Sequence, residues 1–408
     1  MQKSEESNQK QNKNMIKSIL DTDIYKFSMS YAYFKLYPLA EGTFKFNDRN
    51  KESWKEHPEI LETLKMELYK ASDLSLTEEE KNWCIDHIPY IPGSYWEWLS
   101  TFKFDPSLIN CWLDEEGILQ CEVTDKMYKV SLYEILILAT WAEIRNSWLK
   151  SNGYPFYIDK AKEIITEKID FANRNQIPFS EFGTRRRYSS AVHEMILDVI
   201  KEKSLTCTGT SNVFYAMKYG MKPQGTTAHE FYQMHAALFG YKRANYLALE
   251  DWIKVYDGAL GTALVDTYTT KSFLRTLTRK QALLLQGFRQ DSGDEYKVGN
   301  MIISRLKEFG IDPRSKVIVF SNALDFDKAK DIYEYFNGRC IVAFGIGTNL
   351  TCDTGIPDFK PANIVMKLSK CRMSPKDPWE NCIKISDDFG KHMGDDIEFK
   401  IAQYELHF

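Results

Sequence analysis

A series of short apolar runs between residues 177 and 368 constrains the fold of this chain more than any other feature. A polar or glycine-containing turn follows nearly every run, and helical segments lie between most of them. The runs cover residues 177–182, 205–208, 224–228, 263–265, 283–288, 316–320, 341–344 and 364–368. Strand–turn–helix units of this kind, repeated about every twenty to forty residues, predict a parallel sheet. About seven or eight such units in one block favour an α/β fold with a closed or irregular β/α barrel over an open sheet.

The chain before this block has a more mixed pattern. Residues 1–14 are rich in Lys, Gln, Asn and Ser and have little to bury, so we expect a disordered tail. Asp21 or Thr22 can cap a helix whose apolar residues recur at helical spacing. Beyond it, the sequence predicts a strand at 42–46 and a largely helical region at 52–115. It then predicts a hairpin of 120–124 with 128–130 and a strong amphipathic helix at 132–148.

The charge balance and the cysteines exclude several classes of protein. Lys and Arg number 53 against 57 for Asp and Glu, and this balance argues against a broad nucleic-acid-binding surface. The eight cysteines show neither a CxxC pair nor a metal-binding spacing, which indicates reduced thiols in the cytoplasm. No signal peptide is visible at the N-terminus, and the longest apolar run, 130–142, is interrupted by Glu134 and too short to span a bilayer. We therefore expect a soluble cytoplasmic protein without nucleic-acid or membrane partners.

The turns that follow the predicted strands share one chemical character. In a β/α barrel such turns lie at one face, where the chemistry takes place. Their polar residues and glycines are Arg185, Arg186, Arg187, Ser211, Asn212, His229, Asp266, Thr267, Arg289, Asp291, Ser292, Ser321, Asn322, Asp325, Gly345, Gly347 and Thr348. Guanidinium groups bind phosphate, glycine-rich turns bring N–H groups to phosphate oxygens, and carboxylates hold ribose hydroxyls or the hydration shell of Mg²⁺. The set suits a phosphorylated sugar substrate accompanied by a metal ion.

Each of these residues, taken singly, has an ordinary structural explanation. Consecutive arginines are more often a solvated face, and a single histidine is more often structural than catalytic, as we expect of His193 and His392. The stretch from Gly209 to His235 is more informative. Two small, hydroxyl-bearing turns flank a short helix there, and each could hold an anion against a helix N-terminus. The joint placement of the residues on one rim is what indicates function.

Motifs along nearly the whole chain resemble those of the nicotinate phosphoribosyltransferase family. In order they are LDTDIYKFSM, EFGTRRRYS, GTSNVFYAMKYGMKPQGTTAHEF, VDTYTT, FRQDSGD, FGIGTNLTCD and KISDDFGKHMGD. The resemblance implies an enzyme of NAD salvage that condenses nicotinate with 5-phosphoribosyl 1-pyrophosphate (PRPP) to nicotinate mononucleotide and pyrophosphate. It also implies coupling to ATP hydrolysis through a phosphohistidine, with Mg²⁺ bound by the substrate and no protein ligand assigned to the metal. A homodimer with active sites shared between the subunits is a further implication.

The resemblance also implies a division of the chain into two domains. An irregular, TIM-like β/α barrel would span residues 146–364. A smaller α+β sandwich domain would combine residues 15–145 with residues 365–408.

The residues expected to bind nicotinate follow from the same motifs. Phe182 resembles the aromatic residue that stacks on one face of the pyridine ring, and Tyr25 the residue that covers the other face from the partner subunit. Arg185 is expected at both the pyridine and the phosphoribosyl sites. Ser211 occupies the place of an Asp in the related nicotinamide enzymes, and its hydroxyl can donate to a carboxylate that an Asp would repel. His229 matches the phosphorylated histidine.

The remaining site residues are expected to bind PRPP. Arg289 and Asp291 match catalytic contacts to the ribose and the pyrophosphate. The other PRPP-binding residues implied are Arg49, Asp266, Ser321, Asn322, Gly345, Gly347 and Thr348, the last three of which form the turn for the 5′-phosphate. Two places depart from the family pattern. Asn322 stands where the family often has Asp, and Asp325 could compensate. The Arg-rich segment after the first strand also differs, because FKFNDRN leaves Arg49 as the expected phosphate contact.

Two alternatives to nicotinate transfer remain at this point. The first is nicotinamide phosphoribosyltransferase, against which Ser211 and the FGTRRR segment count. The second is a non-catalytic, phosphate-binding barrel, which the departure at Asn322 favours slightly.

Overall fold

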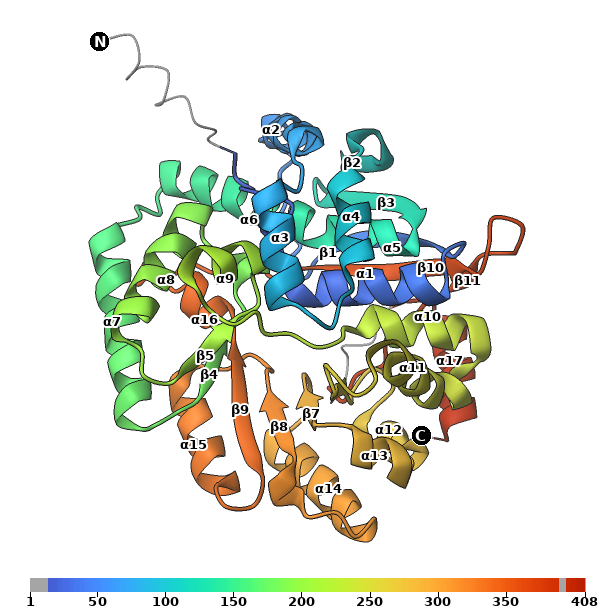
Figure 1. Ribbon diagram of the computed structural model, residues 1–408. Coiled ribbons are helices and arrows are strands. Elements are labelled where there is room, and N and C mark those ends of the chain that lie inside the picture. The colour runs from blue at the N-terminus through green and yellow to red at the C-terminus, as the bar shows by residue number, and fades with distance from the viewer. Residues whose placement is uncertain (1–13, 389–393, 408) are drawn as a thin grey trace.

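The protein is a mixed α/β molecule with one parallel and one antiparallel sheet, each in its own half of the computed structural model (Figure 1). The structure describes residues 14–388 and 394–407. The expected tail lies outside these ranges apart from Asn14, and so does His392. The predicted α/β class is confirmed.

The parallel sheet has six strands in the order β5-β4-β9-β8-β7-β6. Their bounds are β4 (Phe179–Glu181), β5 (Cys207–Thr210), β6 (Thr262–Leu264), β7 (Gly287–Gln290), β8 (Val317–Phe320) and β9 (Ile341–Ile346). Apolar side chains from neighbouring strands meet in register, as Phe288 does with Ile318 and Ile318 with Val342. Burial of such side chains from water is the main stabilising contribution of the sheet.

One of the predicted strands is absent from this sheet. Residues 224–228 are extended but form no strand, and the segment makes a single bridge to the sheet, between Thr210 and Pro223. The strand expected at 364–368 does form, but it belongs to the antiparallel sheet. Six parallel strands therefore replace the seven or eight expected, and among the described residues no strand pairing joins the edge strands β5 and β6. The barrel is irregular on this side.

Helices surround the parallel sheet and begin close to the carboxyl ends of its strands. They are α7 (Ile158–Arg174), α8 (Ser190–Lys203), α9 (Val213–Tyr219), α10 (His229–Phe239), α11 (Tyr241–Tyr256), α12 (Thr270–Thr276), α13 (Arg279–Leu284), α14 (Glu295–Glu308), α15 (Phe326–Phe336) and α16 (Thr348–Thr351). Several start at a side chain that accepts a backbone N–H of the first turn, namely Ser189, Asn212, Asp294 and Asp325. Such caps satisfy N–H groups that lack partners within the helix.

The antiparallel sheet joins the two ends of the chain. Its order is β11-β10-β1-β3-β2, and its strands are β1 (Glu41–Asp48), β2 (Ile109–Leu113), β3 (Leu119–Lys126), β10 (Ile364–Arg372) and β11 (Glu380–Asn381). β1 pairs with β10 over its whole length, from Glu41 opposite Arg372 to Asp48 opposite Ile364. The N-terminal and C-terminal segments therefore form one sheet.

The expected hairpin of 120–124 with 128–130 is wrong. β3 pairs instead with β2, and residues 127–130 form the short helix α5 (Met127–Val130). The turn between β2 and β3 explains the pairing, because Asp114 Oδ1 accepts from the backbone N–H of Glu116 and of Ile118 and Gly117 adopts a φ of 81°. An acidic residue followed by glycine is a typical signal for such a turn.

Helices α2 (Glu59–Tyr69), α3 (Glu78–His87), α4 (Gly93–Thr101) and α6 (Tyr133–Ser151) lie in the half that holds the antiparallel sheet (Figure 1). The first and last described helices are α1 (Ile24–Leu36) and α17 (Asp396–Leu406). The long helix expected at 132–148 is confirmed by α6, whereas the region 52–115 is helical only up to residue 108 and ends in β2. Among the described helices, none combines the length and the apolar character needed to cross a membrane.

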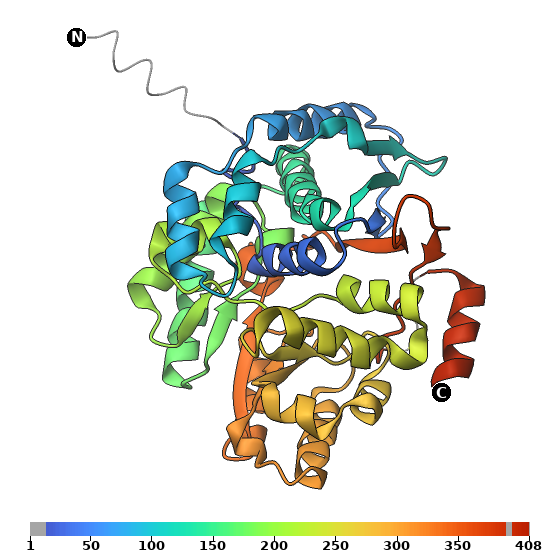
Figure 2. The ribbon, with the colours of Figure 1, turned by 45° about the vertical axis from the view of Figure 1, so that its right-hand side comes forward.

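Helix α1 lies between the two halves of the molecule, while α17 lies beside α11 at one edge (Figures 1 and 2). The cap position of α1 is Asp23, not Asp21 or Thr22, and its side chain does not cap the helix. Asp21 is instead bound to Arg187 and Asn212. The start of α1 is held against the parallel sheet, because Ile24 N–H donates to the Ser211 carbonyl and Asp23 bridges to Asn212.

Candidate active site

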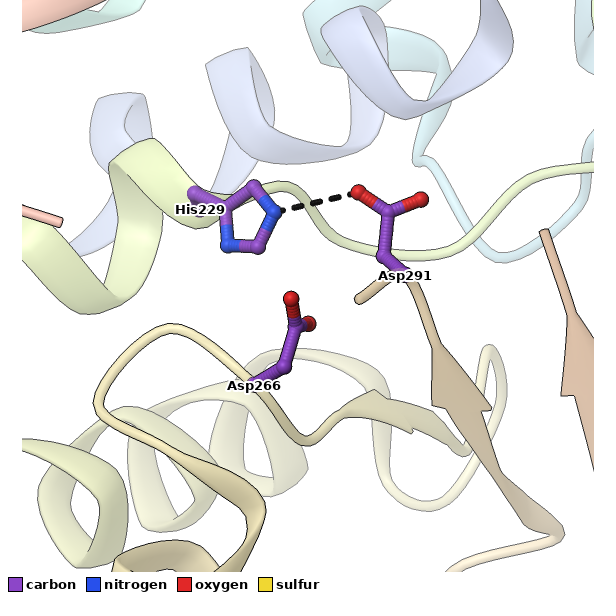
Figure 3. Close-up of side chains that lie close together, drawn as sticks. All are labelled: His229, Asp266 and Asp291. Atoms are coloured by element: carbon purple, nitrogen blue, oxygen red, sulfur yellow. Dashed lines mark hydrogen bonds and ion pairs between the residues drawn. The ribbon is translucent and has the colours of Figure 1, made fainter. Parts of the chain in front are cut away.

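A cavity of about 810 Å³ lies between the carboxyl ends of the parallel strands and the antiparallel sheet. The turns after β4, β5, β7, β8 and β9 line it, together with the start of α1 and part of β10. The expected site residues that line it are Tyr25, Arg49, Phe182, Arg185, Ser211, His229, Arg289, Asp291, Ser321, Asn322, Gly345, Gly347 and Thr348. Asp266 is the exception, because it is fully buried, and it lies beside His229 and Asp291 (Figure 3). The structure therefore brings together residues that lie far apart in the sequence.

His229 stands at the first position of α10 and is held from both sides of its ring. Its Nδ1 lies 3.0 Å from Thr267 Oγ1, and its Nε2 lies 3.2 Å from Asp291 Oδ2 (Figure 3). The Nζ of Lys384, from the segment after β11, lies 2.8 Å from the same Nε2. Burial and the neighbouring Lys384 lower the pKa of His229 to about 4. The imidazole is therefore neutral near pH 7.

The contacts of His229 also indicate which ring nitrogen carries the proton. An ammonium can only donate, so the 2.8 Å contact with Lys384 requires an unprotonated Nε2, whereas the 3.2 Å contact with the Asp291 carboxylate would require a proton on that nitrogen. The shorter contact favours the unprotonated Nε2. Nδ1 then carries the proton and donates to Thr267 Oγ1. In this tautomer the free electron pair of the ring is on Nε2, beside Asp291 and Lys384. The arrangement suits a nucleophilic nitrogen.

His229, Asp266 and Asp291 form a cluster whose ligand atoms lie within 4.8 Å of one another. Asp266 Oδ1 is buried and has no hydrogen-bond partner among the described residues, while its other oxygen accepts from Ser292. Carboxylates are the ligands that Mg²⁺ prefers. Lys384 lies 3.6 Å from Asp266, however, and Arg289 lies 2.9 Å from Asp291, so cations of the protein already offset both carboxylates. The cluster fits an ion that arrives with a phosphate substrate better than a resident metal.

Arg289, Asp291 and Ser321 form a closed hydrogen-bond network at the ends of β7 and β8. Arg289 donates to Asp291 Oδ1 at 2.9 Å and to Ser321 Oγ at 3.0 Å, and Ser321 Oγ lies 2.9 Å from the same carboxylate oxygen. Burial would raise the pKa of Asp291, but Arg289 and His229 outweigh it and hold this pKa well below its ordinary value. The network fixes a guanidinium and a carboxylate toward the cavity.

The glycines of the predicted phosphate turn have a packing role. A Cβ on Gly345 would lie 2.4 Å from the Phe182 ring, and one on Gly347 would lie 2.8 Å from the Phe182 carbonyl oxygen. The aromatic ring expected to stack on the pyridine therefore rests directly on β9. Glycine at these two positions is explained by this close approach, whatever binds to the N–H groups of the turn.

The contact made by Ser211 differs from the expectation. Its hydroxyl donates to Asp23 Oδ1 at 2.6 Å, so in this structure its one O–H donor is not available to a nicotinate carboxylate. Asp23 is itself buried and lines the cavity. Burial raises the pKa of Asp23, and this effect outweighs the hydrogen bond from Ser211. A carboxyl group therefore stands beside Ser211 after all, supplied by α1 and missed in the sequence.

Tyr25 and Phe182 of one chain line the same cavity. A Cβ on Gly225 would lie 3.6 Å from Tyr25 Cβ, which shows how closely the loop before His229 packs on the start of α1. The supply of Tyr25 by a partner subunit stays a prediction.

The three consecutive arginines have three different roles. Arg187 is fully buried, and it pairs with Asp21 at 2.8 Å, so it is structural. Arg186 lines the cavity, and its Nε donates to the Ile364 carbonyl. Burial and the neighbouring Arg185 lower the pKa of Arg186 to about 9. Arg185 lines the cavity and lies 3.9 Å from Glu134.

The loop after β8 carries one of the two departures from the family pattern. Asn322 and Asp325 both line the cavity, but one oxygen of Asp325 caps α15 by accepting from Lys328 N–H. Ala323 between them has a φ of 47°, which is uncommon for a residue other than glycine. Only the other carboxylate oxygen of Asp325 is therefore available to replace the carboxylate that is missing at Asn322.

Several residues of the cavity were not predicted from the sequence. They are Asp23, Glu134, Glu230, Lys367 and Lys384. Burial lowers the pKa of Lys367 to about 7. Lys384 lies in the KISDD segment, one of the motifs that resemble the family. This motif was the only sign in the sequence that Lys384 belongs to the site.

Comparisons with known proteins agree with this geometry. Residues 20–141 match the model of the nicotinate phosphoribosyltransferase (NAPRTase) N-terminal domain, and residues 177–407 match that of the nicotinate phosphoribosyltransferase (NAPRTase) family. A nicotinate phosphoribosyltransferase of Desulforapulum autotrophicum is 37% identical over 385 residues, which cover 94% of this chain and 97% of that protein. One from Chromohalobacter salexigens is 37% identical over 394 residues, with 96% and 98% covered. The crystal structure of nicotinate phosphoribosyltransferase from Porphyromonas gingivalis is similar with a TM-score of 0.93 and 41% identity, covering 96% of this chain and 100% of that one.

Proposed function

The chain belongs to the nicotinate phosphoribosyltransferase family, and from this premise we propose that it couples the formation of nicotinate mononucleotide to ATP hydrolysis through His229. The family reaction joins nicotinate to PRPP and releases pyrophosphate, a step of NAD salvage. The observation that supports the coupling best is the neutral imidazole of His229, with an unprotonated Nε2 that faces Lys384.

The transfer step needs positioning and charge more than proton transfer. The pyridine nitrogen of nicotinate forms a bond to C1 of the ribose as the C1–oxygen bond to pyrophosphate breaks, and the electron pair of that bond leaves with the pyrophosphate. The ring nitrogen reacts through its free electron pair, so the step requires no general base. Tyr25 and Phe182 would hold the ring, while Arg289 and Asp291 would orient the ribose and the pyrophosphate.

The ATP step follows from the tautomer of His229. Nε2 would attack the γ-phosphorus, the bond from that phosphorus to the bridging oxygen would break, and ADP would leave with the electron pair. Nδ1 keeps its proton and its hydrogen bond to Thr267. The Lys384 ammonium, now 2.8 Å from Nε2, would be displaced onto the phosphoryl oxygens. Hydrolysis of the phosphohistidine would complete the cycle.

Mg²⁺ would enter with PRPP or ATP. Asp266, which has a buried oxygen without a described partner, and Asp291 could hold its hydration shell. The ion would supply positive charge to offset the phosphate oxygens.

A homodimer and a cytoplasmic location complete the proposal. In the proposed homodimer the active sites would be shared, with Tyr25 of each subunit covering the pyridine ring bound by its partner. Specific activity should then fall when the enzyme is diluted below the dissociation constant of the dimer, and constant activity on dilution would show that each chain forms its own aromatic pair from Tyr25 and Phe182. All eight cysteines are free thiols, which suits a reducing compartment.

The deciding experiment measures pyrophosphate release with PRPP and either nicotinate or nicotinamide, with and without ATP. Release that depends on nicotinate and increases with ATP supports the proposal, and acid-labile phosphate should map to His229. One contact favours nicotinamide as a second candidate, because Asp23 could accept from an amide NH₂. Binding of PRPP without turnover would instead support a non-catalytic phosphate-binding barrel.

A further inference from the structure

A buried ion-pair cluster of Lys26, Glu134 and Glu230 lies at the cavity, which the two glutamates line. The ammonium of Lys26, which is 0% exposed, pairs with Glu230 at 2.6 Å and with Glu134. Glu230 also accepts from Ser131 Oγ at 2.6 Å. Burial would lower the pKa of Lys26, but the two carboxylates outweigh it and raise the pKa above its ordinary value. One ammonium is therefore shared by two buried carboxylates.

Each member of this cluster is adjacent to a residue of the proposed chemistry. Glu230 follows His229 at the start of α10, and Lys26 follows Tyr25 in α1. Glu134 of α6 lies 3.9 Å from Arg185. The Nζ of Lys26 also lies 5.3 Å from the centre of the Tyr25 ring, within range of a cation–π contact. The cluster is thus joined to His229 through the chain at Glu230, and to Tyr25 and Arg185 through the contacts of Lys26 and Glu134.

The charges in the cluster make its arrangement sensitive to a change at His229. Burying charged groups costs free energy, so such a cluster is weak evidence of a purely stabilising role. A phosphoryl group on His229 would add about 1.5 to 2 negative charges one residue from Glu230. This charge would draw Lys26 toward the His229 side and away from Glu134. Glu134 would then be free to pair more closely with Arg185.

We propose that Lys26, Glu134 and Glu230 are positioning residues that transmit the phosphorylation of His229 to Arg185 and Tyr25, and so tighten the binding of nicotinate. The inference rests on the proposed phosphorylation of His229. In this proposal the cluster couples ATP hydrolysis to the affinity of the enzyme for nicotinate. Two sites coupled in this way must share an element whose arrangement both of them change, and the shared ammonium is that element.

The test variant is Glu230→Gln, which removes one carboxylate and keeps the side-chain size. Two quantities are measured: acid-labile phosphate on the enzyme with ATP, and the KM for nicotinate with and without ATP. We expect phosphate incorporation to stay within about twofold of wild type, while the ATP-dependent decrease in KM falls by about fivefold or more. A residue that only stabilised the fold would not separate these two readouts.

A second variant and a matched control complete the design. Glu134→Gln, at the other end of the cluster, should lose the ATP effect on KM in the same way and serves if Glu230→Gln does not fold. Glu41→Gln removes a carboxylate that pairs with Lys126 and Arg372 outside the cavity lining, and it should keep the full effect.

Three outcomes would overturn the inference. An unchanged ATP effect in both variants would show that the cluster transmits nothing. Loss of phosphate incorporation in Glu230→Gln would place Glu230 in the phosphorylation step itself. Absence of acid-labile phosphate from the wild-type enzyme would instead refute the proposed ATP coupling, on which this inference rests.

Discussion

At the His229 end of the cavity the two carboxylates beside the imidazole, Asp266 and Asp291, each lie next to a cation, whereas at the Ser211 end the carboxyl group of Asp23 accepts from a hydroxyl. Asp291 pairs with Arg289, and Asp266 lies 3.6 Å from Lys384. Asp23 accepts from Ser211, and burial raises its pKa. The first end can receive several phosphate charges. The second end can accept one anionic base only if Asp23 is neutral or its charge is offset, and Arg185 is a cavity cation whose charge acts to lower the pKa of Asp23.

The largest expected effect tests whether His229 alone defines its end of the cavity. His229→Ala should abolish acid-labile phosphate and all stimulation by ATP, because no other described side chain has its position between Lys384 and Thr267. Synthesis without ATP should persist. His57→Ala, at a half-exposed histidine outside the cavity lining, is the control. Full ATP stimulation in His229→Ala would refute the assignment.

The pH dependence of the same step follows from the low pKa of His229. A histidine with an ordinary pKa of 6.5 is mostly protonated at pH 5.5, whereas His229, with a pKa of about 4, stays neutral there. The rate of phosphoenzyme formation should therefore not fall between pH 7 and 5.5 through protonation of this residue. A decline in that single-turnover rate with a midpoint near 6.5 would contradict the buried, cation-flanked environment.

Removing the cation tests the charge matching directly. Lys384→Met should slow phosphoenzyme formation by about 10- to 100-fold, because the developing phosphoryl charge loses a donor. It should also raise the pKa of His229, since Lys384 is the second largest cause of its depression after burial. Rapid quench of the phosphoenzyme across pH measures both effects. Lys376→Met, on the exposed loop between β10 and β11, should change neither.

A smaller effect on activity is expected from a substitution in β9, on which the Phe182 ring packs. Gly345→Ala places a methyl group 2.4 Å from the Phe182 ring, so the ring must move. The KM for nicotinate should rise about 5- to 50-fold, and by more than the KM for PRPP. Gly93→Ala is the control, because its new methyl group would meet nothing closer than 3.9 Å. A larger rise for PRPP would indicate that the turn serves mainly the phosphate.

Local signals explain which elements of the fold could be predicted. Apolar runs identified β4, β8 and β9, and the capping residues Ser189 and Asp325 mark the starts of the helices after β4 and β8. The sequence from Asp114 to Gly117 is typical of the turn between β2 and β3. The predicted hairpin nevertheless began at residue 120, after this turn, because apolar residues continue into α5. The extended segment 224–228 has strand composition, but Thr227 accepts from Arg289 through its carbonyl and the segment bends away toward His229. Tertiary contacts decided its conformation.

The site divides in the same way between local and distant contacts. His229, Arg289 and the glycines after β9 lie in motifs that are continuous in the sequence. Ser211 and Asp23 are 188 positions apart, and Lys384 and His229 are 155 apart. No periodicity or spacing predicts such contacts. The environment of a residue, including its partner and its pKa, was therefore missed even where the residue itself was found.

The smallest expected effect decides whether the comparison between the two ends holds. Asp23→Asn keeps the size of the side chain and removes the charge, so the amide can donate to a nicotinate carboxylate where Asp23 could repel it. In the wild type, deprotonation of Asp23 as pH rises above its raised pKa should increase the KM for nicotinate, and in the variant this increase should disappear. At alkaline pH the variant should bind nicotinate about 3- to 10-fold more tightly than the wild type. Ser211→Ala removes the hydroxyl that donates to Asp23, and a double-mutant cycle of the two substitutions measures their coupling. If Asp23→Asn weakened nicotinate binding at every pH, Asp23 would be a direct and favourable contact of the base, and the contrast between a cation-matched end and an anion-discriminating end would fail.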